Sequence, residues 1–263
     1  MNKKDNFFKE DVSIVLCGQA GQGIKTIELI LVNVLKESGY NVFSTKEYMS
    51  RIRGGSNSTL IRVSNKNIKS MKYKIDLLIP LDINAIDHVA DRLCENTIIL
   101  GDKDVLKSTK YEIIDIPLLK TAKEIGNKIY ENIVACGAIL ALFNSDLVLL
   151  NEYISHKFEK KGKDIVNNNI EAAKKGYELG KKLYDDSLVR IDIKINPEIK
   201  NDYFLNGNDA VGYGALMGGC NFISSYPMSP GTGVLTFLSE HSKEMGIAVE
   251  QAEDEISAVN MGI

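Results

Sequence analysis

The sequence lacks any pair of cysteines close enough to share a metal ion or an iron–sulfur cluster. Its four cysteines are widely separated, and no C-x-x-C motif occurs. Each stands in or beside an apolar run, which favours a small buried hydrophobic role. The three histidines are equally isolated, so the sequence predicts no metal site in this chain. The cysteines are Cys17, Cys94, Cys136 and Cys220.

The chain also lacks a strong charge bias and a long hydrophobic run. A net charge of −3 over 263 residues gives no reason to expect nucleic-acid or membrane-surface binding. The first ten residues lack the apolar core and cleavage site of a secretory signal, and no stretch approaches the ~20 apolar residues of a membrane span. We therefore expect a cytoplasmic protein. With 44% hydrophobic residues it can form one large or two smaller domains.

Strands and helices alternate over residues 1–185. Residues 12–16 form an apolar strand, and residues 27–35 follow with helical spacing. Further strands are expected at 75–81, 97–100 and 111–116, with a helix over 86–93 between the first two. This alternation predicts βαβ units around a mainly parallel sheet. An apolar helix at 132–143 is expected to be buried, and amphipathic helices are expected over 153–161 and 168–183.

A glycine-rich turn follows the first strand and contains Gly18, Gly21 and Gly23. A turn of this kind at a helix N-terminus presents backbone N–H groups to an anion. The spacing is G-x-x-G-x-G, which is not the dinucleotide-binding pattern, and Lys25 stands one residue too far from Gly23 for a phosphate-binding loop. The sequence therefore disfavours a nicotinamide or ATP site.

A second loop carries Arg51, Arg53, Gly54 and Gly55. Guanidinium groups pair with phosphate or carboxylate in a bidentate manner, so this loop is a candidate anion-binding element. The alternative is a salt-bridged loop that docks onto a partner chain.

The pattern changes at residues 186–205, where a charged stretch with one short alternating segment predicts a linker and an edge strand. Beyond it, residues 222–225 look like a buried strand that leads into the turn Tyr226-Pro227-Met228-Ser229-Pro230-Gly231, with a helix from about Gly233. Residues 246–249 form a second short strand that delivers Glu253. Strand ends of this kind are where α/β proteins bind ligands, so we expect both ends to face one crevice.

Three motifs of the last quarter, G-N-D-A-V-G-Y-G-A-L-M-G-G-C, S-Y-P-M-S-P-G-T and Q-A-E-D-E-I-S-A-V-N-M-G, occur in order. This segment resembles the pyrimidine-binding domain of the 2-oxoacid:ferredoxin oxidoreductases, which use thiamine diphosphate. The resemblance implies that Glu253 hydrogen-bonds the cofactor's aminopyrimidine ring, and that Ser229, where the family usually has threonine, lies beside the 2-oxo acid. Tyr226 and Pro227 belong to the same cofactor-binding turn. The alternatives are an acid in the first turn of a helix for Glu253 and an ordinary turn residue for Ser229.

The glycine-rich turn resembles the opening of the same family's gamma domain, with Ala20 in place of a glycine, and R-x-R-G-G matches that domain's arginine–glycine loop near the catalytic interface and coenzyme A. The order of domains is similar to that of the fused large subunit, including 2-oxoglutarate-type enzymes. The resemblance implies a gamma-type α/β domain at 1–185, a linker at 186–205, and the first part of a thiamine-diphosphate-binding α/β domain at 206–263. Since that subunit normally continues for several hundred residues, we expect a truncated chain.

The implied activity is oxidative decarboxylation of a 2-oxo acid to acyl-CoA and CO₂, with electrons passed to ferredoxin. Nothing in the chain matches the G-D-G element that holds magnesium and diphosphate, and nothing binds clusters. The resemblance therefore implies a hetero-oligomer, in which a beta subunit supplies Mg²⁺, the diphosphate site and the iron–sulfur cluster. The alternatives are a non-catalytic scaffold subunit and a nucleotide-binding Rossmann-like domain.

Overall fold

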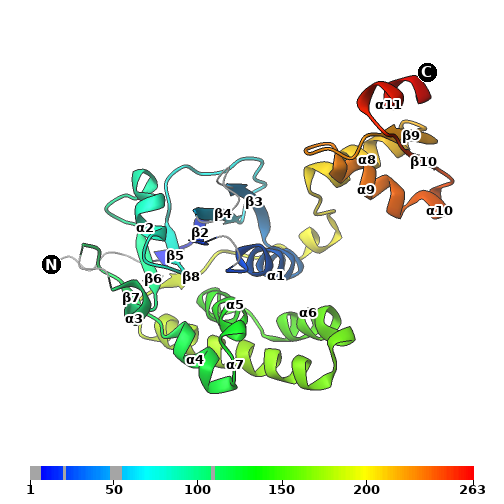
Figure 1. Ribbon diagram of the computed structural model, residues 1–263. Coiled ribbons are helices and arrows are strands. Elements are labelled where there is room, and N and C mark those ends of the chain that lie inside the picture. The colour runs from blue at the N-terminus through cyan, green and yellow to red at the C-terminus, as the bar shows by residue number, and fades with distance from the viewer. Residues whose placement is uncertain (1–6, 20–21, 48–54, 108–109) are drawn as a thin grey trace. The chain divides into compact units, whose positions relative to one another are not determined.

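The computed structural model describes residues 7–19, 22–47, 55–107 and 110–263 (Figure 1). Internal contacts divide the chain into two units, Met1–Asp202 and Tyr203–Ile263.

The first unit is built on a six-stranded sheet with the order β3-β4-β2-β5-β6-β7. The run from β2 to β7 is parallel, as the sequence predicts. The pairings of β4 with β2 and with β3 are antiparallel. The strands of this unit are β1 (Phe7–Phe8), β2 (Asp11–Gln19), β3 (Asn41–Glu47), β4 (Ser56–Ser64), β5 (Leu77–Pro80), β6 (Ile98–Gly101), β7 (Ile114–Asp115) and β8 (Arg190–Ile191).

The antiparallel hairpin of β3 and β4 is the part of the sheet that the βαβ pattern does not predict. A parallel crossover needs a dozen or more residues, and only the short stretch from 48 to 55 separates these strands. The hairpin is therefore the connection that the chain length allows.

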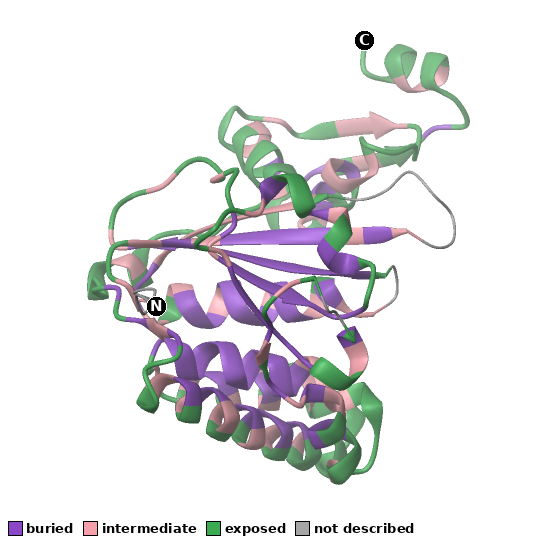
Figure 2. Ribbon diagram, turned by 90° about the vertical axis from the view of Figure 1, so that its left-hand side faces the viewer, coloured by how far each residue is buried: buried purple, intermediate pink, exposed green. Residues whose placement is uncertain are grey.

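Both faces of the central strands are buried, as expected for parallel strands between helical layers (Figure 2). On one face, Ile14 and Leu16 join the hydrophobic core that includes α1 and α5. On the other face, Val15 and Cys17 join a smaller cluster with residues of α2. The helices are α1 (Ile24–Glu37), α2 (Ala85–His88), η1 (Ala90–Arg92), α3 (Lys103–Leu106), α4 (Leu118–Ile125), η2 (Lys128–Tyr130), α5 (Glu131–Leu142), α6 (Val148–Phe158), η3 (Glu159–Lys161), α7 (Lys163–Asp185) and η4 (Pro197–Asn201).

Two elements differ from the sequence-based expectation. The helix expected over 86–93 is only the single turn of α2, followed by the 3₁₀ turn η1. The buried Arg92 guanidinium bonds to the carbonyl of Tyr73 and to Glu47, so tertiary contacts determine the local path here. The strand expected over 111–116 is reduced to β7.

Helices α5 and α7 pack with their backbones in contact. A Cβ atom placed on Gly176 would lie 2.0 Å from the carbonyl oxygen of Val134, and one on Gly180 would lie 2.1 Å from that of Ala138. On the opposing helix, a Cβ on Gly137 would lie 2.1 Å from the oxygen of Ala173. Glycine is therefore required on both helices, because no side chain fits between them.

The segment that follows α7 belongs to the first unit. Val189, Ile191 and Ile193 are buried in the main core, and β8 pairs in parallel with β1. The sequence predicts a linker over 186–205, but the units divide only after Asp202, because these alternating apolar residues pack on the sheet layer.

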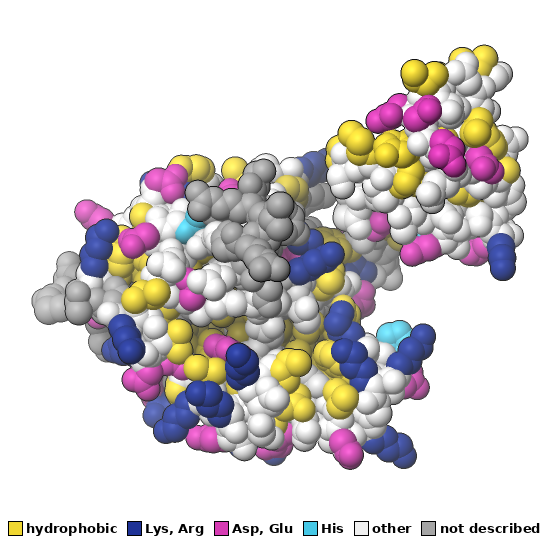
Figure 3. All heavy atoms as spheres, in the orientation of Figure 1, with side chains coloured by type: hydrophobic (Ala, Val, Ile, Leu, Met, Phe, Trp, Pro, Cys, Tyr) yellow, Lys and Arg dark blue, Asp and Glu magenta, His cyan; other side chains and the backbone are white. Residues whose placement is uncertain are grey.

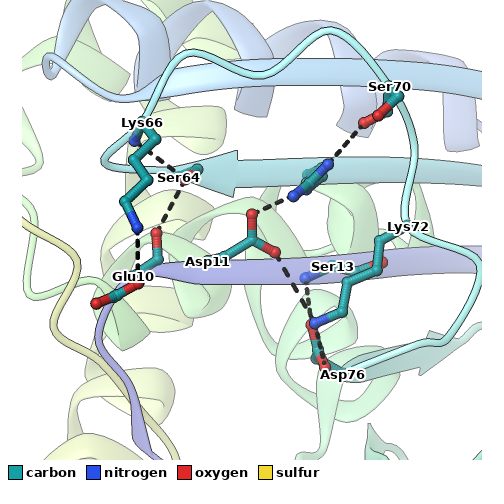
Figure 4. Close-up of polar contacts among 9 residues, drawn as sticks. Glu10, Asp11, Ser13, Ser64, Lys66, Ser70, Lys72 and Asp76 are labelled. Carbon is teal, nitrogen blue, oxygen red and sulfur yellow. Dashed lines mark hydrogen bonds and ion pairs between the residues drawn. The ribbon is translucent and has the colours of Figure 1, made fainter.

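A polar network holds the long loop between β4 and β5 at the amino end of β2 (Figure 4). Arg62 Nε donates to Asp11 Oδ2 at 2.8 Å, and Lys72 Nζ lies 2.8 Å from Asp76 Oδ2. The same Asp76 oxygen accepts the backbone N–H of Ser13 at 2.8 Å. Since these cations are paired with carboxylates, the network is self-neutralised and has a structural role.

The second unit contains a two-stranded parallel sheet with helices on it. Its buried core is small, consisting of Phe237, Leu238 and Ile247 with partly buried neighbours. The strand at 222–225 is less buried than its sequence predicts, since Phe222 is 38% exposed. The elements are α8 (Gly207–Met217), β9 (Phe222–Ser225), α9 (Thr232–Glu240), α10 (Ser242–Met245), β10 (Ala248–Gln251) and α11 (Glu255–Met261).

The contact between α5 and α7 predicts a large effect of a single methyl group. We expect Gly176→Ala to lower the free energy of unfolding by about 1–3 kcal/mol, because the new Cβ meets backbone that cannot rotate away. Lys174→Ala, on the exposed side of the same helix, should change it by no more than ~0.5 kcal/mol. Urea denaturation followed by circular dichroism measures both, and equal stabilities for the two variants would contradict the close contact.

Candidate functional site

The carboxyl ends of β9 and β10 lie side by side in the second unit. The strands are parallel and pair from Phe222 with Ala248 to Ser225 with Gln251. Beyond the last pair, the N–H of Ala252 donates to the carbonyl of Ser225 at 3.1 Å. The residues that follow each strand therefore emerge at one edge of the sheet.

The turn after β9 is closed by its own backbone. The N–H of Met228 donates to the carbonyl of Tyr226 at 2.8 Å, and the N–H of Gly231 donates to the carbonyl of Met228 at 3.0 Å. The peptide bond between Ser229 and Pro230 is cis. Tyr226, Ser229 and the residues between them are exposed, so this turn presents its side chains outward at the sheet edge.

Glu253 stands between β10 and α11 and is exposed. It does not cap the helix: Asp254 is the N-cap, and its Oδ1 accepts the N–H of Ser257 at 2.7 Å. This hydrogen bond lowers the pKa of Asp254. The alternative role of Glu253 as an acid in the first helical turn therefore does not hold, since α11 begins at Glu255.

The G-N-D-A motif joins the first turn of α8 to the first turn of α9. Asn206 accepts the N–H of Asp209 at 3.1 Å and donates to its carboxylate at 2.6 Å, which caps α8. Asn208, the second residue of α8, lies against Gly233, where a Cβ would fall 2.2 Å from its Nδ2. Asn208 was not singled out from the sequence, and only its place within the motif signals it.

In the first unit, the glycine-rich turn is occupied by the protein's own groups. The N–H of Gln19 donates to Gln22 Oε1 at 2.7 Å and to Asp82 Oδ2 at 2.8 Å. A Cβ on Gly18 would lie 2.2 Å from that Gln22 oxygen. Gly23 has a φ of 78° and caps α1 without a side chain. Gly21, the remaining glycine of the predicted set, lies outside the described residues.

The end of β2 is also electrostatically unfavourable for an anion. Burial, followed by the nearby carboxylates of Asp82 and Glu47, raises the pKa of the Cys17 thiol to about 12, against the opposing effect of Arg92. Asp82 is itself buried. A phosphate on the glycine-rich turn would lie beside this carboxylate, which agrees with the expectation that the turn is no nucleotide phosphate site.

Of the arginine–glycine loop, Arg51, Arg53 and Gly54 lie outside the described residues, and Gly55 has a φ of 120°. A cavity of about 260 Å³ lies between the start of α1 and the start of β4. It is lined by Gln19, by residues 23–25 and by residues 57–59. The turn and the strand that follows this loop therefore border one cavity.

The cysteines divide into two kinds. Cys17 and Cys136 are buried as predicted, but Cys94 is exposed and Cys220 is half-buried, so for these two the prediction was wrong. Cys94 follows η1, and its thiol contacts Thr97 Oγ1 at 3.4 Å, which lowers its pKa.

Within the described residues, no group of three or more His, Cys, Asp or Glu side chains is arranged to hold a metal ion. No described helix combines the length and the apolarity needed to cross a bilayer.

Family models match both units of the chain. Residues 13–179 match the family model "Pyruvate ferredoxin/flavodoxin oxidoreductase", and residues 213–263 match "Pyruvate flavodoxin/ferredoxin oxidoreductase, thiamine diP-bdg". The chain belongs to the pyruvate ferredoxin/flavodoxin oxidoreductase family. The suspected resemblance and the predicted fold class are thereby confirmed.

Relatives of known name agree with this assignment. The chain is 25% identical to a 2-oxoacid:ferredoxin oxidoreductase subunit alpha from a Sulfolobus species, over 96% of this chain and 48% of the relative. It resembles the solved 2-oxoglutarate:ferredoxin oxidoreductase of Magnetococcus marinus with a TM-score of 0.86 and 30% identity, over 96% of this chain and 45% of that one. The chain also resembles the solved gamma subunit of a keto/oxoacid ferredoxin oxidoreductase from Geobacter sulfurreducens, with a TM-score of 0.55 and 23% identity. This match covers 65% of this chain and 97% of the gamma subunit, and it shows a common fold alone. The chain spans about half the length of the first two relatives.

The different environments of the thiols predict a labelling order. Cys94 should react first with iodoacetamide at pH 8, because it is exposed and its pKa is lowered. Cys17 and Cys136 should stay unlabelled in the folded protein, because burial keeps both thiols protonated. Mass spectrometry of digested samples measures the order, and Cys94→Ser should remove the fastest phase. Labelling of Cys17 at the rate of Cys94 would contradict the burial.

Glu131, at the start of α5, is half-buried, and burial followed by the nearby Asp102 raises its pKa above the ordinary 4.5. The folded state therefore holds this proton more tightly than the unfolded state, so wild-type stability falls as the pH rises through and above 4.5.

We expect Glu131→Gln to match wild type in stability below this window and to exceed it increasingly as the pH rises. Unfolding free energies measured from pH 4 to pH 8 test this, with Glu152→Gln, an exposed position of α6, as control. A difference that is independent of pH would contradict the assignment.

Proposed function

We propose that this chain is part of a 2-oxoacid:ferredoxin oxidoreductase, which converts a 2-oxo acid, coenzyme A and oxidised ferredoxin into acyl-CoA, CO₂ and reduced ferredoxin. Membership of the family supports this class of reaction. The observation that carries the proposal is the parallel pairing of β9 with β10, because it brings the turn at Ser229 and the carboxylate of Glu253 to one edge of a sheet. Ligands of α/β proteins bind at such an edge.

The residues present fit the aminopyrimidine side of thiamine diphosphate. An exposed carboxylate with no capping role is available at the end of β10, and an outward-facing turn with a hydroxyl and an aromatic ring stands next to it. When bound, thiamine diphosphate supplies a nucleophilic carbon and takes up the electrons released by decarboxylation.

Glu253 would share a proton with a ring nitrogen of the aminopyrimidine through a carboxylate oxygen. Proton sharing of this kind is favoured in a site from which water is excluded, since desolvation raises the pKa of a carboxyl group. Glu253 is exposed in this chain, so the proposal requires another surface to cover it.

Ser229 would donate its hydroxyl hydrogen to the 2-oxo acid, and Tyr226 and Pro227 would contact the cofactor. Serine keeps the hydroxyl that threonine provides at this place in the family, but it lacks the second Cβ substituent that restricts rotation about χ1. Tyr226 is 38% exposed and can pack against a planar ring without leaving its turn.

Coenzyme A is the proposed ligand of the loop containing Arg51, Arg53, Gly54 and Gly55. The related Magnetococcus marinus enzyme was solved with coenzyme A bound. Arginine pairs with phosphate in a bidentate manner, and the cavity beside α1 is lined by residues 57–59 of the strand that follows this loop. The glycines of the neighbouring turn, Gly18, Gly21 and Gly23, would give close backbone approach to an uncharged part of the ligand, since Asp82 disfavours phosphate there.

A beta subunit is the proposed source of Mg²⁺, the diphosphate site, the iron–sulfur cluster and the contact with ferredoxin. Exposed apolar side chains of the second unit, such as Met217 at 88% and Ile256 at 76%, suit a chain that works within a hetero-oligomer. The cytoplasm is the proposed location, because four free thiols persist in a reducing compartment.

Replacement of Glu253 tests the proposal directly. In the full-length subunit assembled with its partner, Glu253→Gln should lower the rate of 2-oxo acid decarboxylation by about 10²–10⁴-fold, because the amide cannot exchange the proton. Glu244→Gln, which removes an exposed carboxylate from α10, should leave the rate unchanged. Equal rates for the Glu253 and Glu244 variants would show that the role assigned to Glu253 is wrong.

A further inference from the structure

Asn208 lies at the edge of the second unit where the proposed site is formed. Its side-chain amide fills the space that a side chain at position 233 would occupy, since a Cβ there would fall 2.2 Å from Nδ2 and 2.5 Å from Cγ. Gly233 is the second residue of α9, and α9 begins directly after the turn that ends β9. Asn208 is therefore held against the start of α9, the helix that follows the turn carrying Ser229 at the carboxyl end of β9.

The amide of Asn208 is available to a ligand. The residue is exposed, and no hydrogen bond between described residues uses its side chain. Its neighbours in the motif are committed, because Asn206 and Asp209 bond to each other at the start of α8. An asparagine amide offers two N–H donors and one acceptor oxygen.

The second unit is predominantly acidic, so a neutral hydrogen-bond donor is important for binding a negatively charged substrate. Residues 203–263 contain seven acidic residues but only one basic residue, Lys243. Figure 3 shows acidic side chains beside hydrophobic ones on the visible face of this unit. Lys243 belongs to α10, which follows α9 and precedes β10, so it lies at the opposite, amino edge of the strands. Within this unit, a negatively charged substrate at the carboxyl edge can be held only by neutral donors.

We propose that Asn208 is a substrate-binding residue whose amide N–H donates to the carboxylate of the 2-oxo acid, beside the hydroxyl of Ser229. This inference rests on the proposed function, because it names the group that recognises the substrate in that same site. Gly233 is then required as the residue that leaves room for the amide.

The test uses the full-length subunit assembled with its partner and measures kcat and KM for the 2-oxo acid and for coenzyme A. Asn208→Ala should raise KM for the 2-oxo acid roughly tenfold or more, as expected for loss of a hydrogen bond to a charged group, and leave KM for coenzyme A unchanged. Asn208→Asp should raise it further, because two carboxylates would then face each other. Gly233→Ala should act in the same direction, because its methyl group displaces the amide.

If Asn208 had a purely structural role, the effect of each substitution on KM would follow its effect on stability. An aspartate beside the first turn of α9 favours the helix dipole, so Asn208→Asp should keep or raise the melting temperature. A variant that is as stable as wild type but binds the 2-oxo acid worst cannot be explained by misfolding. The controls are Asn221→Asp, at the amino end of β9, and Gly214→Ala, where no atom lies within 4 Å of the added Cβ. Both should leave every kinetic constant within twofold of wild type.

Two outcomes overturn the inference. If Asn208→Asp and Gly233→Ala both leave KM for the 2-oxo acid within twofold of wild type, Asn208 does not bind substrate, although the wild-type activity still supports the proposed function. If the assembled wild-type enzyme decarboxylates no 2-oxo acid, the proposed function fails and the inference falls with it.

Discussion

The parallel pairing of β9 with β10 is the constraint on which the candidate site depends. A one-residue slip would turn every side chain to the other face of the sheet, so the register from Phe222–Ala248 to Ser225–Gln251 determines what appears at the strand ends. The bond from the N–H of Ala252 to the carbonyl of Ser225 extends this register beyond the strands. Glu253 consequently leaves the sheet next to the turn that carries Ser229.

The two units use their strand ends differently. In the first unit, the N–H of Gln19, the last residue of β2, and the N–H of Asn84, after β5, donate to Asp82, so one buried carboxylate takes the place that an anionic ligand has in many α/β proteins. In the second unit, Tyr226 and Ser229 after β9 and Glu253 after β10 are exposed. At the first edge, these backbone N–H groups are thus hydrogen-bonded within the protein. At the second edge, exposed side chains face a ligand or a partner.

The sequence predicts the parallel strands and the buried helix α5 well, because long apolar runs such as those of β2 and α5 have few alternative structures. It does not predict the single turn of α2, where the contacts of Arg92 outweigh local periodicity. In the site, the motifs predict that the turn and Glu253 meet at one edge. Asn208 could not be found this way, since its significance comes from packing against Gly233, 25 positions later in the chain.

The hairpin of β3 and β4 has a consequence for how this family can diversify. Its strands pair in antiparallel register from Asn41–Ser64 to Glu47–Ser58, and β3 is the outermost strand at that end of the sheet. Insertions or replacements between these strands leave the hydrophobic interior untouched, because the ribbon closes on itself before the connection begins. Sequence variation between these two strands can therefore accumulate without a matching loss of folding free energy.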